Sequence, residues 1–307
     1  MVKYNVIGDI HGRTSWKELV IEDGINIFVG DYFSPYHSEY TFEKCMQNFR
    51  DIIEFKKQRP ETILLIGNHD ADHWQWNHDR YQCSRHDFNH DDEIAEEFEK
   101  NKDLFQIAYS AGNQYLISHA GVSMVWYYRN KVLAGQDNIN RFSIVDQFID
   151  LTYPKSIEFS TAMEAYIENE EFKQKHSSGH YKAKYEFRDN MLLLWKDGWY
   201  TSKDNEWDKI ETETPDSIAE FVNKLWKERD IEFKFDRNAM HGDYCGESIT
   251  HSPVWIRPSE LNDANIFRGT NFKQVVGHTM FINVTEEDNL IFVDCLEYNS
   301  ESFTFEC

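Results

Sequence analysis

A largely parallel α/β fold with both sheet faces covered is the class that this sequence predicts. Apolar runs at 2–7, 25–29 and 62–66 alternate with helical patterns over the first 66 residues. Strands of parallel sheets are buried on both faces and therefore read as continuous apolar runs. Each run is followed by a small residue and then by polar ones, and functional residues of such sheets collect at the carboxyl ends of the strands. The sequence thus predicts an α/β domain with a site at one edge of its sheet.

The remaining elements follow in the same order along the chain. The longest expected helix covers 38–57, where Phe42, Phe49 and Ile52 recur at helical spacing and Ser38 or Thr41 can cap the start. Short or acidic helices are also expected at 14–22 and 92–102, strands at 114–118, 274–276, 280–284 and 290–294, and a hairpin turn at 285–289.

The whole chain, 1–307, is expected to form a single domain with a core of 1–121 and 246–307. Between them an acidic, aromatic segment at about 122–245 is expected to be a long, largely helical insertion. Its amphipathic stretch around 218–225 carries Ile218, Phe221, Val222 and Leu225 at helical spacing. We expect these side chains to pack on the core and not to bind a cofactor.

Composition limits the classes of partner. The net charge is −22, from 32 Lys and Arg against 54 Asp and Glu, which argues against broad contact with nucleic acid or anionic membranes. No stretch reaches the roughly 18 apolar residues of a membrane span, and a core-like strand begins at residue 2 in place of a signal peptide. The five cysteines are widely spaced and contain no CxxC pair, so reduced thiols and a cytoplasmic protein are expected.

Five short motifs carry residues that suit divalent metal ions. They are Gly8-Asp9-Ile10-His11-Gly12, Gly30-Asp31, Gly67-Asn68-His69-Asp70, Ser118-His119-Ala120-Gly121 and Gly277-His278-Thr279. Asp9 and His11 can converge on one ion at a strand end, and Asp31 is the natural carboxylate to bridge two ions. Asn68, His119 and His278 would complete the second ion.

Each motif alone has a plainer explanation. A lone Asp-x-His recurs by chance, Gly-Asn forms turns, and an isolated buried histidine is more often structural than a ligand. Five polar clusters that each follow a core strand are hard to explain in that way. Two ions held a few ångströms apart polarise a phosphoryl group and lower the pKa of a bridging water, so the set predicts a di-metal hydrolase.

The ordered set resembles the calcineurin-like metallophosphoesterases, and within them most closely the phosphoprotein phosphatase (PPP) type of bacteria and phages. This resemblance covers the core and implies a four-layer αββα sandwich. It implies one metal held by Asp9, His11 and Asp31, and a second held by Asp31, Asn68, His119 and His278. It also implies that His69, supported by Asp70, protonates the leaving oxygen while a metal-bridging hydroxide attacks in line, without a phosphoenzyme.

One departure from the PPP pattern concerns phosphate binding. The second motif of that type usually supplies an arginine, whereas here Gly30-Asp31 continues as Tyr32-Phe33-Ser34. The stretch 252–258 is similar to one in bacterial PPP-type enzymes where an arginine contacts phosphate, which suggests Arg257 for this role. Arg13, directly after the first motif, is a second candidate. For both, an ordinary ion pair is an equally good explanation.

Two other histidine groups are expected to be loops. His73, His78, His86 and His90 have irregular spacing without a zinc signature, and a solvated acidic loop at the rim of the site is the simpler interpretation. His241-Gly242-Asp243 follows no core-like strand.

The function predicted is a di-metal-dependent phosphoric monoester hydrolase, acting on a phosphorylated protein or small molecule. A phosphodiesterase or dinucleoside polyphosphate hydrolase is the alternative, because the same metal pair serves both reactions, and a non-catalytic binding module is a third possibility. A nuclease is disfavoured by the charge and by Met280. Mn is the expected metal, and Fe, Zn or Co would suit the same ligands.

Overall fold

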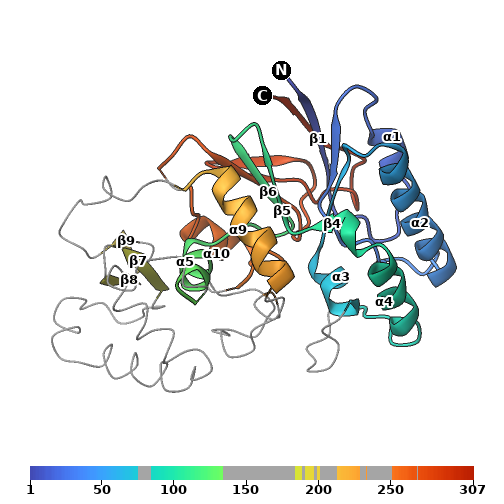
Figure 1. The fold of residues 1–307 in the computed structure, drawn as a ribbon, viewed down its shortest axis with the longest axis horizontal. Coiled ribbons are helices and arrows are strands. Elements are labelled where there is room, and N and C mark those ends of the chain that lie inside the picture. The colour runs from blue at the N-terminus through green and yellow to red at the C-terminus, as the bar shows by residue number, and fades with distance from the viewer. Residues whose placement is uncertain are drawn as a thin grey trace.

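A computed structural model gives the fold of the chain in two facing β-sheets with helices outside them (Figure 1). The residues it describes are 1–74, 84–133, 184–188, 191–196, 199–200, 213–228, 233, 251–267 and 269–307.

The first sheet has the strand order β13-β1-β2-β3-β4. Its members are β1 (Lys3–Ile7), β2 (Ile25–Phe28), β3 (Ile63–Leu65), β4 (Phe105–Gln106) and β13 (Phe303–Glu306). The first four pair in parallel, and β13 pairs antiparallel to β1. This pairing brings the two chain ends together, as Figure 1 shows. The predicted strand-helix-strand alternation is therefore confirmed as a parallel sheet.

The second sheet has the order β11-β12-β10-β6-β5. It contains β5 (Ala108–Ala111), β6 (Tyr115–Ser118), β10 (Lys273–Val276), β11 (Thr285–Glu287) and β12 (Leu290–Phe292). β10 lies parallel to both β6 and β12, so the carboxyl ends of β6 and β10 lie at the same edge of the sheet. The strand predicted at 280–284 is wrong. The antiparallel strand before β12 is β11, and the turn between them is the pair Asp288-Asn289, with Asp288 at a φ of 51° that suits a tight hairpin.

Alternate residues of these strands form two different cores. Val6, Ile27, Leu65, Ile117 and Val275 belong to the cluster between the two sheets. Their chain neighbours point the other way, toward the helices. Because successive strand side chains face opposite sides, both faces of each sheet must be covered, which accounts for the continuous apolar runs in the sequence.

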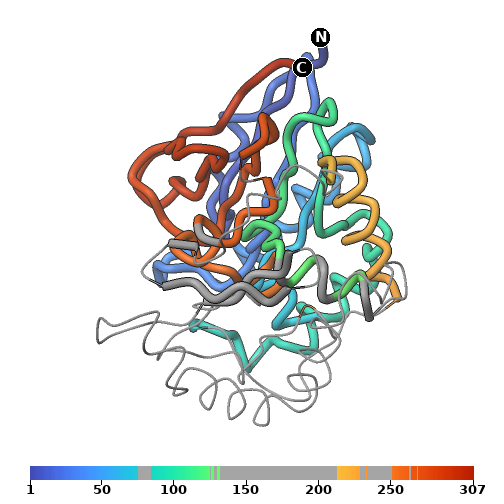
Figure 2. The backbone as a smooth tube through the Cα atoms, turned by 90° about the vertical axis from the view of Figure 1, so that its left-hand side faces the viewer, coloured from blue at the N-terminus to red at the C-terminus, as the bar shows by residue number. Residues whose placement is uncertain are grey.

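Helices cover both outer faces. On the first sheet lie α1 (Trp16–Leu19), α2 (Phe42–Gln58) and α4 (Asp91–Lys100), while α3 (Asn68–His73) follows directly after β3. On the second sheet α10 (Pro258–Asp263) places Leu261 against Val276 and Phe292. α9 (Pro215–Glu228) covers β5 and β6, and Figure 2 shows it beside that hairpin. The order of layers is helix, sheet, sheet, helix, as the predicted fold class requires.

The segment 122–245 contributes to this arrangement. Ile218, Phe221, Val222 and Leu225 of α9 are buried in the same cluster as Leu116 of β6, so the expected packing on the core is confirmed. The Asn223 side chain accepts the backbone N–H groups of Ile107 and Ala108, at 2.9 and 3.0 Å, which fixes the helix to β5. Besides α9 and α5 (Met124–Leu133), the described parts of the segment include three antiparallel strands, β7 (Lys184–Arg188), β8 (Met191–Lys196) and β9 (Trp199–Tyr200). The segment therefore contains strands as well as the expected helices.

Two further observations concern the described residues only. Cys45, Cys295 and Cys307 are free thiols, and the other two cysteines lie outside the described ranges. No helix within those ranges is both long and apolar enough to span a bilayer.

Candidate metal centre

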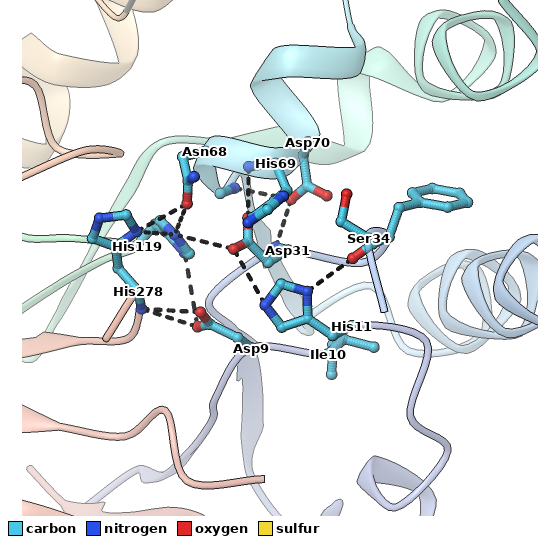
Figure 3. Close-up of polar contacts among 12 residues, drawn as sticks. Asp9, Ile10, His11, Asp31, Ser34, Asn68, His69, Asp70, His119 and His278 are labelled. Carbon is cyan, nitrogen blue, oxygen red and sulfur yellow. Dashed lines mark hydrogen bonds and ion pairs between the residues drawn. The ribbon is translucent and has the colours of Figure 1, made fainter. Parts of the chain in front are cut away.

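The five motifs meet at one edge of the two sheets. Asp9, Asp31 and Asn68 follow the parallel strands β1, β2 and β3, and His119 and His278 follow the parallel neighbours β6 and β10. Since parallel strands end at the same edge, both sheets deliver their motifs to one place. Figure 3 shows the side chains pointing toward one another, and all five are buried.

One group of donors surrounds Asp31. His11 Nε2 lies 3.6 Å from Asp31 Oδ2, and His119 Nε2 lies at the same distance from that oxygen. Donor atoms of His11, Asp31 and His69 all lie within 4.8 Å of one another, and so do those of Asp9, Asp31 and His119. Asp31 therefore belongs to both groups, as a bridging carboxylate must.

A second group surrounds Asn68. Its Oδ1 lies 2.9 Å from His119 Nε2 and 2.9 Å from His278 Nδ1, and these two nitrogens are 3.2 Å apart (Figure 3). Three potential ligand atoms from three strand ends thus converge on one point.

Backbone carbonyls set the tautomer of each ligand histidine. A carbonyl oxygen can only accept, so His11 Nδ1 must donate to Phe33 O (2.9 Å) and His119 Nδ1 to Val29 O (3.0 Å). His278 Nε2 donates to Trp255 O at 3.0 Å in the same way. The other nitrogen of each neutral ring is left with a lone pair facing the site, the arrangement usual for metal-ligating histidines.

The donor set therefore fits divalent cations. Around Asn68, two imidazole lone pairs and an amide oxygen face one another without a proton among them. Around Asp31, buried carboxylates face a further lone pair. A dense group of buried acceptors is costly unless a cation joins it, and mixed nitrogen and oxygen donors suit borderline transition metals.

Electrostatics support the same interpretation. Burial, followed by the charges of Asp294 and Asp31, raises the pKa of Asp9 well above its ordinary value. Burial also lowers the pKa of His11 and of His119 to about 3, which favours neutral rings. Two carboxylates held this close repel each other in the absence of a cation.

The loops that carry the ligands are tightly folded. His11, Asp31 and His278 have positive φ angles of 44°, 53° and 66°, a region that non-glycine residues seldom occupy. Such strain persists only where the surrounding structure imposes it, and it concentrates at functional sites. The motif glycines allow the loops to approach, because a Cβ on Gly67 would lie 2.1 Å from Asp31 Oδ1 and one on Gly277 2.2 Å from Asp9 Oδ1.

A family model described as calcineurin-like phosphoesterase matches residues 2–280. The chain belongs to the calcineurin-like phosphoesterase family. A search of curated proteins returned no match. Among solved structures, the chain is similar to a cold-active protein-tyrosine phosphatase from a psychrophilic Shewanella species, with 14% identity, a TM-score of 0.44, and coverage of 100% of this chain and 76% of that one. It is also similar to a Saccharomyces cerevisiae protein serine/threonine phosphatase described as resembling human PP5, with 14% identity, a TM-score of 0.40, and coverage of 95% and 66%.

In this phosphoesterase the side chain of His69 lies beside the candidate ligands, whereas that of Asp70 binds backbone groups. The His69 ring lies beside that of His11, with centroids 5.1 Å apart, and burial, then the charges of His11 and Arg85, lowers its pKa. The Asp70 carboxylate instead accepts the backbone N–H groups of Asp31, Tyr32 and Gly67, at 2.7, 2.8 and 2.9 Å. The hydrogen bonds of Asp70 therefore join the loops after β2 and β3, whereas the sequence suggested that it supports the imidazole of His69.

The two predicted phosphate-binding arginines, Arg257 and Arg13, have different partners in the structure. Arg257 donates to the carbonyl of His278 (3.2 Å) and to Thr279 Oγ1 (3.1 Å), and its charge lowers the pKa of His119. The Arg13 side chain is 7% exposed and forms an ion pair with Glu297. Arg257 thus lies beside His278 of the candidate metal centre, while Arg13 is paired with Glu297 and its charge also acts on Asp9 and His11.

Sequence reasoning missed two charged residues at the site. Arg85 stacks over Tyr36, 3.7 Å from the ring centroid, and its charge lowers the pKa of both His11 and His69. No local pattern marks Arg85, which lies in an irregular loop. Asp294 is buried and shares a hydrogen bond with Asp9; burial, partly offset by Arg13, raises its pKa to about 6. Asp294 follows the apolar run of β12, but no glycine or serine separates them, so it lacks the pattern of the five motifs.

Proposed function

We propose that this phosphoesterase is a di-metal-dependent phosphomonoesterase of the PPP type, acting on phosphorylated proteins or small phosphorylated metabolites. The observation that carries the proposal is the convergence of nitrogen and oxygen donor atoms from five strand ends on Asp31 and Asn68. Asp9, His11 and Asp31 would hold one ion, and Asp31, Asn68, His119 and His278 the other. When bound, such ions supply a hydroxide at neutral pH and neutralise charge on the phosphoryl oxygens. Mn²⁺ is the proposed ion, with Fe, Zn or Co able to use the same ligands.

Arginines on two sides of this centre support a monoester substrate. The charge of Arg85 acts on His11 and His69, and the charge of Arg257 on His119 and His278. A monoester phosphate carries up to two negative charges and three free oxygens, so it can use both guanidinium groups. In this proposal Arg85 replaces the arginine missing from the second motif.

His69 is the proposed general acid. Its backbone N–H donates to Asp31 Oδ1 at 2.9 Å, which ties the residue to the bridging carboxylate and holds its ring at the metal centre. A ring N–H of His69 would give its proton to the leaving oxygen. Asp70 would serve by holding the loops on which Asp31 and His69 stand.

The remaining proposals concern the whole chain. We propose a single domain over 1–307, in which 122–245 interrupts the core formed by 1–121 and 246–307. The burial of α9 against β5 and β6 supports this reading. Free thiols at Cys45, Cys295 and Cys307 suit a reducing compartment such as the cytoplasm.

A substrate panel tests the function. Nitrophenyl phosphate, bis(nitrophenyl) phosphate, a phosphopeptide and a dinucleoside tetraphosphate are incubated with Mn²⁺ and the enzyme, with Asn68→Ala as the control. We expect turnover of the monoester and phosphopeptide that is lost in Asn68→Ala. Preference for the diester or the dinucleotide would replace the proposal with the alternative hydrolase. Bound metal without any turnover would favour a binding module.

A further inference from the structure

A second group of histidines and carboxylates lies at the far end of α3. His73 and His86 were expected in a solvated loop, but their side chains are 0% and 1% exposed. They lie against Asp91, the first residue of α4, and against Asp72. His90 instead stacks on Phe42, and His78 lies outside the described residues. The interpretation as a solvated loop is wrong for His73 and His86, because both side chains are buried where residues 84–90 meet α3 and the start of α4.

Donor atoms in this group converge as they do in the catalytic centre. His73 Nδ1 is 2.8 Å and His86 Nε2 is 3.3 Å from the same oxygen, Asp91 Oδ1. One ligand atom from each of the three residues lies within 4.8 Å of the others. The two imidazole rings are nearly parallel, with centroids 4.1 Å apart, so both edges face the carboxylate.

His86 repeats the arrangement of the ligand histidines. Its Nδ1 binds Asp72 Oδ2 at 2.8 Å, which leaves Nε2 directed at Asp91. A carboxylate behind an imidazole fixes the tautomer and raises the basicity of the other nitrogen, and metal sites use this arrangement regularly. His73 Nε2 is buried without a hydrogen-bond partner in the described part of the chain, which is costly for a purely structural cluster.

We propose that His73, His86 and Asp91 bind a third divalent cation, of the zinc type, with Asp72 fixing the ring of His86. Two imidazoles, one carboxylate and an open fourth position are a donor set that zinc accepts. Asp91 is 19% exposed, which gives the ion a route from solvent.

Charge balance distinguishes this proposal from a simple ion-pair cluster. Without a cation, a proton on His86 would have to balance Asp72 and Asp91. A divalent ion would satisfy both carboxylates with neutral rings, and it would compete with that proton.

The third ion would act on the catalytic centre through α3. Asn68 and His69 stand at the start of this six-residue helix and His73 at its end, while Arg85 directly precedes His86. An ion that joins α3 to α4 would therefore orient a proposed metal ligand, the proposed acid and a proposed phosphate-binding arginine together. This would be a positioning role.

The test counts Co²⁺ ions on the full chain after chelation and reloading. We expect three per wild-type chain, two in His86→Gln and in Asp91→Asn, and three in the matched control His90→Gln, which alters a histidine of the same loop. We also expect visible absorption typical of four-coordinate Co²⁺ to weaken in the two site variants. Two ions in the wild type, with His86→Gln equal to His90→Gln, would overturn the proposal.

A second measurement covers the case in which a site variant fails to fold. The double variant Asp31→Asn with His119→Gln removes ligands of the catalytic centre only, and circular dichroism checks its fold. We expect it to retain one Co²⁺, and Zn²⁺ added without Co²⁺ to raise its melting temperature. Retention of no ion and no response to Zn²⁺ would exclude the third site, whatever the activity of the enzyme.

Discussion

The backbone N–H of Asp31 donates a hydrogen bond to Asp70 Oδ2 at 2.7 Å. This bond ties the backbone of the residue proposed to bridge two metals to Asp70, which follows a different strand. Two more backbone N–H groups, those of Tyr32 and Gly67, bind the same carboxylate. Asp70 therefore holds the loop after β2 against the loop after β3.

Asp70→Asn should weaken the protein and its metal binding together. The amide keeps one acceptor oxygen and turns an NH₂ group toward backbone donors, leaving at least one buried N–H unpaired. We expect a loss of about 1–3 kcal/mol in the free energy of unfolding, measured in urea, with weaker Mn²⁺ binding. Unchanged Mn²⁺ affinity with slower turnover would instead show that Asp70 acts on His69.

Gly277→Ala should disrupt the junction between the two sheets. Its Cβ would lie 2.2 Å from Asp9 Oδ1 and 2.7 Å from Val29 Cγ2, so the loop or Asp9 must move. We expect metal content and activity to fall at least tenfold. Gly269→Ala is the control, because Gly269 has a positive φ of 76° but nothing lies within 4 Å of its Cβ position. It should cost roughly 1–2 kcal/mol of backbone strain and leave metal content intact.

Chelation should destabilise the folded chain. Removing cations leaves the buried carboxylates of Asp9 and Asp31 facing each other, with pKa values raised by burial and by neighbouring charges. Free ion at 1,000 times its dissociation constant stabilises by about 4 kcal/mol, which corresponds to a melting shift of roughly 8–16 °C. Scanning calorimetry with EDTA and with restored Mn²⁺ measures this shift. Equal melting temperatures would contradict metal binding at this centre.

Arg85→Ala and Arg257→Ala should each lower kcat/KM for a phosphomonoester. A lost hydrogen bond to a charged group costs about 1.5–3 kcal/mol, or roughly 10- to 150-fold. Arg50→Ala is the control, since Arg50 is on α2 and pairs with Glu97. Arg85→Ala and Arg257→Ala should both keep the metal content of the wild type. Wild-type kinetics in Arg85→Ala would remove Arg85 from the phosphate site.

The ion pair between Arg50 and Glu97 should make a small, pH-dependent contribution to stability. The hydrogen bond from Arg50 lowers the pKa of Glu97, although burial opposes the shift. A lowered carboxyl pKa stabilises the fold above the unfolded value of about 4.3 and loses this effect as pH falls through the folded value. Because the Arg50 side chain is 54% exposed, we expect no more than about 1 kcal/mol. Urea unfolding of Glu97→Gln and wild type should differ at neutral pH and converge below about pH 4. A difference that grows in acid would contradict this assignment.

Local sequence was enough to predict the main strands and a cluster of candidate ligands. Apolar runs marked the strands, and the Gly-Asp and Gly-His pairs after them marked side chains that meet in the structure, because parallel strands end at a common edge. The wrong strand at 280–284 shows the limit of this reasoning. A short apolar run beside an edge strand has no obligatory hydrogen-bond partner, and the turn residues Asp288-Asn289 decided which residues pair.

The sequence by itself determined the α/β class and pointed to the candidate ligands at the strand ends. Only the tertiary structure decided which charges meet. Arg13 pairs with Glu297, far away in the chain. Arg85 reaches the metal centre from an irregular loop, and His73 and His86 become buried against Asp91. Periodicity and spacing encode which face a side chain occupies, because they act over a few residues. The partner of a charged side chain depends on segments that packing brings together from distant positions, and no local pattern records it.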